Sequence, residues 1–157
     1  MRFKIDDTSF AFLNCHLKSG EGNVAKRVEM LQTILSTAFV EQKGMPGLDK
    51  HSIVMVFGDM NFRVQCDYQT AINAFMSNDY RFLLAHDELN YLWQSTHLQE
   101  KNPVFQSSKV QQLLSSLLEG QIQFPPTYKY QVGSSYLDPK LRVPSYTDRI
   151  LFQENVD

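Results

Sequence analysis

A short apolar stretch that ends in a glycine and three evenly spaced polar residues most constrains what this chain can fold into. Residues 53–57 are all apolar, and Gly58 follows them directly. A run of this length, rich in β-branched and aromatic residues, is typical of a strand that is buried on both faces. Asp59, Asn61 and Arg63 follow at alternate positions, and such residues project to one side of an extended chain. The stretch therefore predicts a carboxylate, an amide and a guanidinium that project together from a strand end.

These polar side chains have a functional and a purely structural interpretation. As a site, they can hold a hydrated metal ion, a catalytic water or an anionic substrate, since carboxylate oxygens suit Mg²⁺ and an amide can donate to a phosphoryl oxygen. As plain structure, the strand simply runs into a polar turn. His16 raises the same question, because it ends another expected strand and ligands gather at strand ends in α/β sheets. Taken alone, a loop histidine is usually an ordinary hydrogen-bonded residue.

The composition of the 157 residues is that of one globular domain, with 43% hydrophobic and 20% charged residues. A formal net charge of −2 provides no basic field, so a nucleic-acid partner is not expected. The sequence has no apolar run of 18 residues and no signal-peptide pattern at its start. Its two cysteines lack metal-type spacing, which favours reduced thiols and a cytoplasmic location. The oligomeric state stays open.

The hydrophobic pattern predicts a chain that contains both short strands and helices. The expected strands are residues 2–5, 9–15, 53–57 and 147–152. The expected helices are one from Asn23, its N-cap, to near Gln42, one that Asp67 caps, and three at residues 79–84, 86–98 and 108–119. In the first helix an apolar stripe runs from Val24 to Leu35, and Arg27 lies off this stripe.

Basic residues gather in two proline-containing stretches that cannot be helical. They are Lys129, Lys140, Arg142 and Arg149. Cations on constrained loops can hold phosphates in fixed positions, whereas each one taken alone is ordinary solvated charge. Tyr128 and Tyr146 lie among these basic residues, and two interpretations stay open for them: stacking on a ligand, or packing in the core. Asp148 and Arg149 open an apolar strand, where a structural salt bridge and a place in an active site are both compatible with the pattern.

Four stretches of the chain match segments that occur in this order in one protein family. The two most specific are Gly58-Asp59-Met60-Asn61-Phe62-Arg63, which fits Gly-Asp-x-Asn-Phe/Tyr-Arg, and Arg142-Val143-Pro144-Ser145-Tyr146-Thr147-Asp148-Arg149-Ile150-Leu151, which fits Arg-x-Pro-Ser/Ala-Trp/Tyr-Cys/Thr-Asp-Arg-Ile/Val-Leu. The other two are Asn14-Cys15-His16-Leu17 and Pro126-Thr127-Tyr128-Lys129-Tyr130. With these motifs the chain resembles the inositol polyphosphate 5-phosphatase family of the DNase-I-like endonuclease/exonuclease/phosphatase superfamily.

The resemblance implies a fold and a reaction. The implied fold is part of a four-layered α/β sandwich, in which helices flank two packed, mostly antiparallel sheets. The implied reaction is Mg²⁺-dependent removal of the 5-phosphate from phosphatidylinositol 4,5-bisphosphate or 3,4,5-trisphosphate, or from soluble inositol polyphosphates. The sequence does not choose between the lipid and the soluble substrate. It therefore leaves two locations open, in the cytoplasm or in peripheral contact with a membrane surface.

The resemblance also assigns roles to individual residues. Asp59 would orient or activate the attacking water, Asn61 would stabilise the pentacovalent phosphoryl group, and His16 would bind the scissile phosphate. Asp148 and Arg149 would complete the pocket on the side of the second motif. The substrate-binding residues would be Arg63 together with Tyr128, Lys129, Lys140 and Arg142, the last four of which match positions that contact the substrate's 4-phosphate.

Compared with the family, the chain departs in length and in one packing residue. Family domains have an upstream portion that supplies the main Mg²⁺ ligand and a downstream Ser-Asp-His segment, and we find neither in residues 1–157. We therefore interpret the chain as a partial catalytic domain and expect it to fold poorly and show little activity by itself. Val56 stands where the family usually has tryptophan. Two other functions stay open: a non-catalytic remnant that binds phosphoinositides or a protein, and a superfamily nuclease, against which the charge argues.

Overall fold

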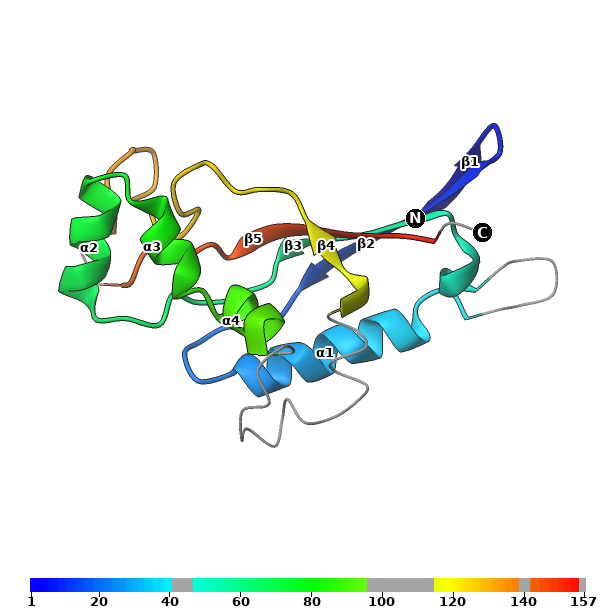
Figure 1. The fold of residues 1–157 in the computed structure, drawn as a ribbon, viewed down its shortest axis with the longest axis horizontal. Coiled ribbons are helices and arrows are strands. Elements are labelled where there is room, and N and C mark those ends of the chain that lie inside the picture. Colours follow the sequence, from blue (N-terminus) through cyan, green and yellow to red (C-terminus); the bar gives the residue numbers. More distant parts are fainter. Residues whose placement is uncertain (41–46, 96–114, 139–141, 156–157) are drawn as a thin grey trace.

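The computed structural model describes residues 1–40, 47–95, 115–138 and 142–155. These residues form one five-stranded sheet with the strand order β1-β2-β3-β5-β4 (Figure 1). The strands are β1 (Arg2–Ile5), β2 (Thr8–His16), β3 (Ile53–Asp59), β4 (Leu118–Glu119) and β5 (Asp148–Glu154). β2 and β3 are parallel, and the other neighbours are antiparallel. The α/β class is confirmed, and the second sheet of the expected sandwich is not among the described residues.

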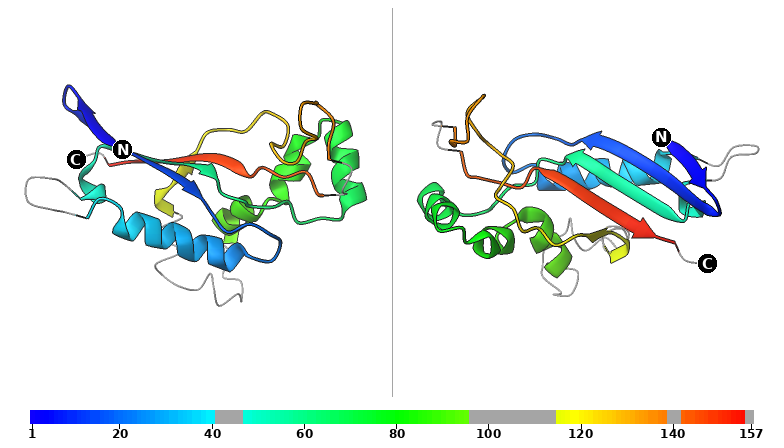
Figure 2. Two further views of the ribbon diagram at one scale, coloured as in Figure 1. Left: turned by 180° about the vertical axis from the view of Figure 1, so that it is seen from behind. Right: turned by 90° about the horizontal axis from the view of Figure 1, so that it is seen from above.

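Helices cover one face of this sheet. The described helices are α1 (Val24–Thr37), the 3₁₀ helix η1 (Leu48–Lys50), α2 (Tyr68–Met76), α3 (Tyr80–Ala85) and α4 (Glu88–Ser95), of which α1 and α4 lie over the sheet. Figures 1 and 2 show α1 and α4 on the same side of the sheet, whereas α2 and α3 lie beyond the strand ends. No described helix lies over the opposite face in these views. Within the described ranges, no helix has the length and apolarity that a membrane span requires.

Burial alternates along the strands because the helices cover only one face. The buried strand positions pack with α1 in one core that includes Ala11, Leu13, Val54, Val56, Leu151, Val28 and Leu31. Burying an aliphatic side chain of this size contributes roughly 1.5–3 kcal/mol. On the other face Phe12 and Phe57 are only half-buried, and Phe3 stacks on Phe10 with 5.3 Å between ring centroids. We call the helix-covered side the closed face and the other side the open face.

The first helix differs from its prediction at both ends. At the start, Asn23 does not cap the helix, because its side-chain amide donates to the carbonyl oxygens of Ser19 and Glu21 instead. At the other end the helix stops at Thr37, where the following residue is extended. The predicted end near Gln42 lies outside the described residues.

The predicted elements that became β3, α2, α3 and β5 are confirmed. The expected burial of β3 on both faces is wrong, because only Val54 and Val56 on the closed face are buried. The prediction for residues 108–119 fails at its end. Asp67 caps α2 by accepting a hydrogen bond of 3.0 Å from the Thr70 N–H. Leu118 and Glu119 form a strand rather than a helix, because they pair with the edge of β5. The first part of that predicted helix lies outside the described residues. Both cysteines are free thiols, as predicted.

Candidate active site

Three polar side chains lie in one row across the end of the sheet. The strand register aligns His16 of β2 with Asp59 of β3, and Asp59 with Asp148 of β5. Because β2 and β3 are parallel, their carboxyl ends meet, and the antiparallel β5 begins at the same edge. Residues in one row project to one face, here the open face, and His16 Nε2 lies 3.6 Å from Asp59 Oδ2. The structure thus brings together three predicted catalytic residues, whose roles stay predictions.

Gly58 allows β2 and β3 to pack together beside this row. Its φ is +126°, a conformation that residues with a Cβ rarely adopt. A Cβ at this position would lie 2.2 Å from the Cys15 carbonyl oxygen and 2.7 Å from Asn14 Oδ1. The glycine of the motif is therefore required by backbone packing, and that packing places Asp59 opposite His16.

Asn61 is buried, with only 3% of its surface exposed, and it forms hydrogen bonds with Asp59, Leu17 and Arg63. Its Nδ2 donates to the Leu17 carbonyl at 3.1 Å, and its Oδ1 accepts from Arg63 Nη2 at 2.6 Å. Its backbone N–H donates to Asp59 Oδ1 at 3.0 Å. With one amide hydrogen committed to Leu17, at most one is left for a phosphoryl oxygen. The φ of 57° at Asn61 turns the chain, so the predicted extended alternation from Asp59 to Arg63 is wrong.

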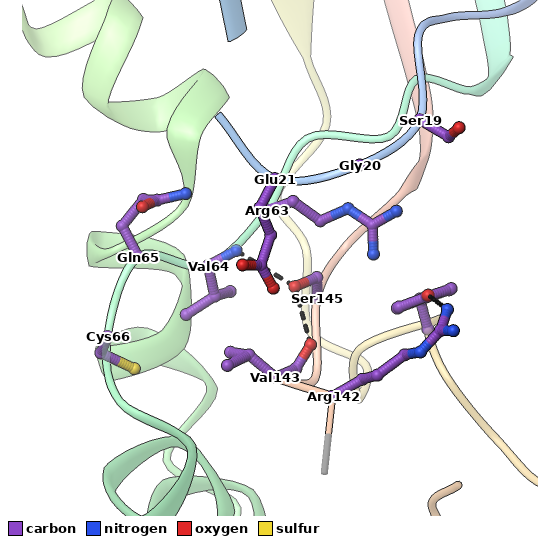
Figure 3. Close-up of a pocket in the computed structure, with 11 residues that line it drawn as sticks. Ser19, Gly20, Glu21, Arg63, Val64, Gln65, Cys66, Arg142, Val143 and Ser145 are labelled. Carbon is purple, nitrogen blue, oxygen red and sulfur yellow. Dashed lines mark hydrogen bonds between the residues drawn. The ribbon is translucent and has the colours of Figure 1, made fainter. Parts of the chain in front are cut away.

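A cavity of about 530 Å³ has a lining that includes Glu21, Arg63, Tyr128, Arg142 and Ser145 (Figure 3). Its Arg63 is connected to the row through Asn61, which contacts both Arg63 and Asp59. The Arg63 guanidinium carbon lies 4.1 Å from the centroid of the Tyr128 ring, and Arg142 Nη1 donates to the Tyr128 hydroxyl at 2.5 Å. Figure 3 shows both guanidinium groups on the same side of the cavity. Two guanidinium groups placed close together suit an anion with several oxygens, such as a phosphate.

The positive charge in the cavity lowers the pKa of the Tyr128 phenol. Burial acts to raise the pKa of its phenol, but the hydrogen bond from Arg142 and the positive charges of Arg142 and Arg63 outweigh burial, and they hold the pKa below its ordinary value. The pKa of Arg142 is raised, chiefly by its hydrogen bond to Tyr128 and to a smaller degree by the charge of Glu21. Sequence reasoning missed Glu21, because a lone acid in a glycine-containing loop carries no motif signal. The cavity lining therefore has two positive charges, on Arg63 and Arg142, and one negative charge, on Glu21.

The structure does not place the other two predicted substrate-binding residues, Lys129 and Lys140, in the lining of this cavity. Lys129 Nζ lies 3.5 Å from Asp138 Oδ2, and Lys129 is absent from the cavity lining. Lys140 lies outside the described residues. Tyr146, for which stacking and core packing were both open, is fully buried in the core. Contacts of Lys129 and Lys140 with a 4-phosphate therefore stay predictions.

A buried ion pair that sequence reasoning missed ties the cavity-lining segments together. Arg27 is fully buried, and its Nη1 lies 2.7 Å from Glu88 Oε2. The same guanidinium donates to the Lys18 carbonyl at 2.9 Å and to the Gly20 carbonyl. Glu88 Oε2 also accepts the Arg63 N–H at 3.0 Å. This pair therefore fixes the segment after β2 and the segment after β3 relative to each other.

The position of Arg27 corrects the sequence prediction, which placed it off the apolar stripe. Arg27 lies three residues after Val24 and four before Leu31, so it belongs at the edge of the stripe and not on the solvent side. This spacing is the signal that could have found it. Glu88 gave no comparable signal, since an acidic residue at a helix start is common on exposed helices.

Asp148 and Arg149 take opposite faces of the sheet, as the period of a strand requires. Asp148 is exposed in the row on the open face. Arg149 is buried on the closed face, where it donates to Asp87 Oδ1 at 2.7 Å and to the two carboxylate oxygens of Glu119 at 2.7 and 2.6 Å. The structure therefore places Arg149 outside the candidate site, in the salt bridge that the sequence left as the alternative.

The described residues fit a Mg²⁺ ion only in part. Asp59 and Asp148 are cross-strand neighbours, and like charges in that arrangement repel, which favours a cation near them. Their carboxylate oxygens are suitable donors for such a cation. However, no group of three or more His, Cys, Asp or Glu side chains in the described ranges is arranged to hold a metal ion. These residues therefore supply oxygen donors without a complete ligand set.

Comparisons with known proteins agree with the motifs. The profile of Endonuclease/Exonuclease/phosphatase family 2 matches residues 1–157. Human Phosphatidylinositol 4,5-bisphosphate 5-phosphatase A is 33% identical over 144 residues, which are 90% of this chain and 13% of that protein. A probable inositol polyphosphate 5-phosphatase of Schizosaccharomyces pombe is 32% identical over 173 residues, which cover 100% of this chain and 13% of that protein. The chain thus spans a minor part of these relatives.

Solved structures show the same fold. The inositol polyphosphate 5-phosphatase domain of SPsynaptojanin, in complex with inositol (1,4)-bisphosphate and a calcium ion, matches with a TM-score of 0.76 and 29% identity over 98% of this chain and 41% of that chain. Cimex nitrophorin matches with a TM-score of 0.63 and 21% identity over 98% of this chain and 46% of that chain, which shows the fold alone. The chain belongs to Endonuclease/Exonuclease/phosphatase family 2, with inositol polyphosphate 5-phosphatases as its relatives.

Proposed function

We propose that the chain contributes a reaction centre and a 4-phosphate pocket to an enzyme that removes the 5-phosphate from inositol lipids or inositol phosphates. The observation that supports this most is the hydrogen-bonded chain from Asp59 through Asn61 to Arg63, which connects the row at the sheet end to the cavity that Arg63 and Arg142 line. A reaction centre next to a second anion pocket suits a substrate with two neighbouring phosphates. The 5-phosphatase names of the relatives support the same reaction.

In the proposed reaction, the oxygen of a water molecule bonds to the phosphorus as the bond from phosphorus to the inositol oxygen breaks. Asp59 takes a proton from the attacking water, and the departing inositol oxygen takes a proton from solvent. A ring N–H of His16 donates to a phosphoryl oxygen, and the Asn61 amide hydrogen that is free of Leu17 is available for another. Positioning and charge stabilisation of this kind account for most of phosphoryl-transfer catalysis.

We also propose that the reaction requires Mg²⁺. The substrate is highly anionic, and Asp59 and Asp148 add two like charges beside it. When bound, the ion would supply the positive charge that offsets them. The described carboxylates are expected to contribute ligands to it, together with groups other than the described ones.

Phosphate release from phosphatidylinositol 4,5-bisphosphate in Mg²⁺ tests this function. The 157-residue chain by itself is expected to release little or no phosphate, because its described residues lack a complete ligand set for a metal ion. A chimera, in which the chain replaces the segment that it matches in the Schizosaccharomyces pombe relative, is expected to release phosphate and leave the 4-phosphate in place. A folded chimera that removes the 4-phosphate, that binds lipid without turnover, or that cleaves plasmid DNA instead would contradict the proposal.

Arg142→Ala is expected to weaken the binding of inositol 1,4-bisphosphate by about tenfold to a hundredfold, since charge-assisted hydrogen bonds to the 4-phosphate are lost. Binding of inositol 1-phosphate is expected to change less than about twofold, because it lacks that phosphate. Isothermal titration calorimetry on the chain measures both. Arg81→Ala, an exposed arginine on α3 that does not line this cavity, is the matched control. Equal losses for the two ligands would show that Arg142 does not read the 4-phosphate.

A further inference from the structure

Residues 130–138 form a short hairpin, which we call the tip hairpin, next to the cavity. The Gln131 N–H donates to the Tyr136 carbonyl at 2.9 Å, and the Asp138 N–H donates to the Lys129 carbonyl at 2.9 Å. These backbone hydrogen bonds fold the two arms of the hairpin onto each other. The chain enters the hairpin two residues after Tyr128, which lines the cavity. The tip hairpin is therefore an ordered projection from the cavity wall.

The turn of the tip hairpin presents two large apolar side chains to solvent. Val132 is 98% exposed and Tyr136 is 76% exposed. The backbone hydrogen bonds of the hairpin do not require either side chain, and water solvates apolar surface poorly. Tyrosine has an amphipathic ring that is favoured at the boundary between lipid and water. This pair of side chains therefore suits a surface that is apolar beneath a polar layer.

Cations lie at the base of the same projection. Lys129 is at the base itself, paired with Asp138, and the exposed Arg142 donates to the adjacent Tyr128. A cation near an anionic membrane surface gains about 1 kcal/mol. In this region the three cations Lys129, Arg63 and Arg142 outnumber the two acids Asp138 and Glu21, which leaves one net positive charge, whereas the whole chain carries a formal net charge of −2. An apolar tip with cations behind it is complementary to an anionic bilayer, whose charge lies at the headgroups and whose interior is apolar.

We propose that the tip hairpin inserts Val132 and Tyr136 into the headgroup region of an anionic lipid bilayer, so that the adjacent cavity takes its inositol phosphate from a membrane lipid. This inference rests on the proposed function and deepens it, because it selects a phosphoinositide over a soluble inositol phosphate. Figures 1 and 2 show this part of the chain, in orange, at the end of the molecule that carries α2 and α3. β1 lies at the opposite end, away from the bilayer in this orientation.

Vesicle sedimentation with the chain tests the inference with a double variant, Val132→Asp with Tyr136→Asp. Binding to phosphatidylcholine vesicles that contain phosphatidylinositol 4,5-bisphosphate is expected to weaken at least about tenfold, while binding of soluble inositol 1,4-bisphosphate changes less than about twofold. Ile5→Asp is the matched control, since Ile5 is 57% exposed and lies in β1. Its vesicle binding is expected to change less than about twofold. A cooperative urea-unfolding transition is the check that both variants are folded.

A second variant gives a spectroscopic readout. In Val132→Trp, added phosphoinositide vesicles are expected to shift the tryptophan emission to shorter wavelength, measured against the background of the single native tryptophan, Trp93. Undiminished vesicle binding by the double variant, an equal loss in Ile5→Asp, or no emission shift would overturn the inference. If the chain fails to bind inositol 1,4-bisphosphate, the proposed function fails. Vesicles of phosphatidylcholine with phosphatidylserine then still decide whether the tip contacts lipid.

Discussion

Replacing Arg149 by alanine is expected to lower the free energy of unfolding by about 3–5 kcal/mol. The guanidinium is buried on the closed face, where it joins Asp87 and Glu119 through three hydrogen bonds of 2.6–2.7 Å. Without it, Asp87 is a fully buried carboxylate that has lost its cation. Asp87 Oδ2 already has no hydrogen-bond partner in the described part of the chain. A buried charge left in this state costs far more than the loss of an exposed pair.

The loss in the free energy of unfolding that Arg149→Ala causes is expected to become smaller as the pH falls. Burial raises the pKa of Asp87 above its ordinary value, and the nearby Arg149 charge opposes that rise. Removing the guanidinium therefore raises the pKa of Asp87 in the folded protein further. The folded variant then takes up a proton at a higher pH than the unfolded chain, so protonation stabilises the folded state. The loss is thus largest above the folded pKa of Asp87 and smaller below it.

Urea unfolding of the chain over a range of pH measures both effects. Arg149→Lys is expected to give a smaller loss than the alanine variant, because it keeps the charge but cannot form the planar fork of hydrogen bonds. Lys4→Ala removes an exposed pair, in which Lys4 Nζ lies 3.5 Å from Asp7 Oδ1. This control is expected to cost less than about 1 kcal/mol. A loss for Arg149→Ala as small as that of Lys4→Ala would show that the ion-pair network contributes little.

Asp59→Asn is expected to lower the kcat for phosphate release by about 10²- to 10⁴-fold in the chimera with the Schizosaccharomyces pombe relative. Asparagine has nearly the same shape and keeps an oxygen for the Asn61 N–H, which donates to Asp59 Oδ1 at 3.0 Å. It cannot take a proton from water, so the reaction loses its proposed base while the turn stays intact. Stability measured by urea is therefore expected to be almost unchanged.

Malachite-green detection of released phosphate gives kcat and KM for this variant. Asp49→Asn, at an exposed aspartate in η1 that lies outside the row, is the matched control and is expected to keep full activity. Asp148→Asn tests the second carboxylate of the row under the same conditions. Retention of more than about a tenth of kcat by Asp59→Asn would exclude the assigned role of Asp59 as base.

Short local patterns of apolar and polar residues predicted much of the fold. The apolar run 53–57 became the central strand β3, and its glycine and aspartate lie at the edge where His16 and Asp148 also lie. This worked because each strand end follows from local composition, and parallel pairing of neighbouring strands then brings the ends together. The family motifs added the roles that local physics left open. Those roles await the experiments proposed above.

Features that depend on tertiary contacts could not be predicted in the same way. Arg27 and Glu88 are far apart in sequence, and nothing in either local pattern indicates that they meet in a buried ion pair. Leu118 has a helical pattern on its N-terminal side, but the free edge of β5 determines its conformation. The turn at Asn61 depends on hydrogen bonds to Leu17 and Arg63. Each of these outcomes is set by a partner that the local sequence does not specify.

The central position of β3 has a consequence for the order of events in folding. β3 pairs with β2 and with β5, and both pairings join segments that are distant along the chain. Such non-local pairings form slowly, since loop closure must precede the contacts that stabilise it. His16, Asp59 and Asp148 therefore come together only when both ladders have closed, whereas α1 can form earlier from local contacts. A partly folded chain would display helices before it could position a phosphate.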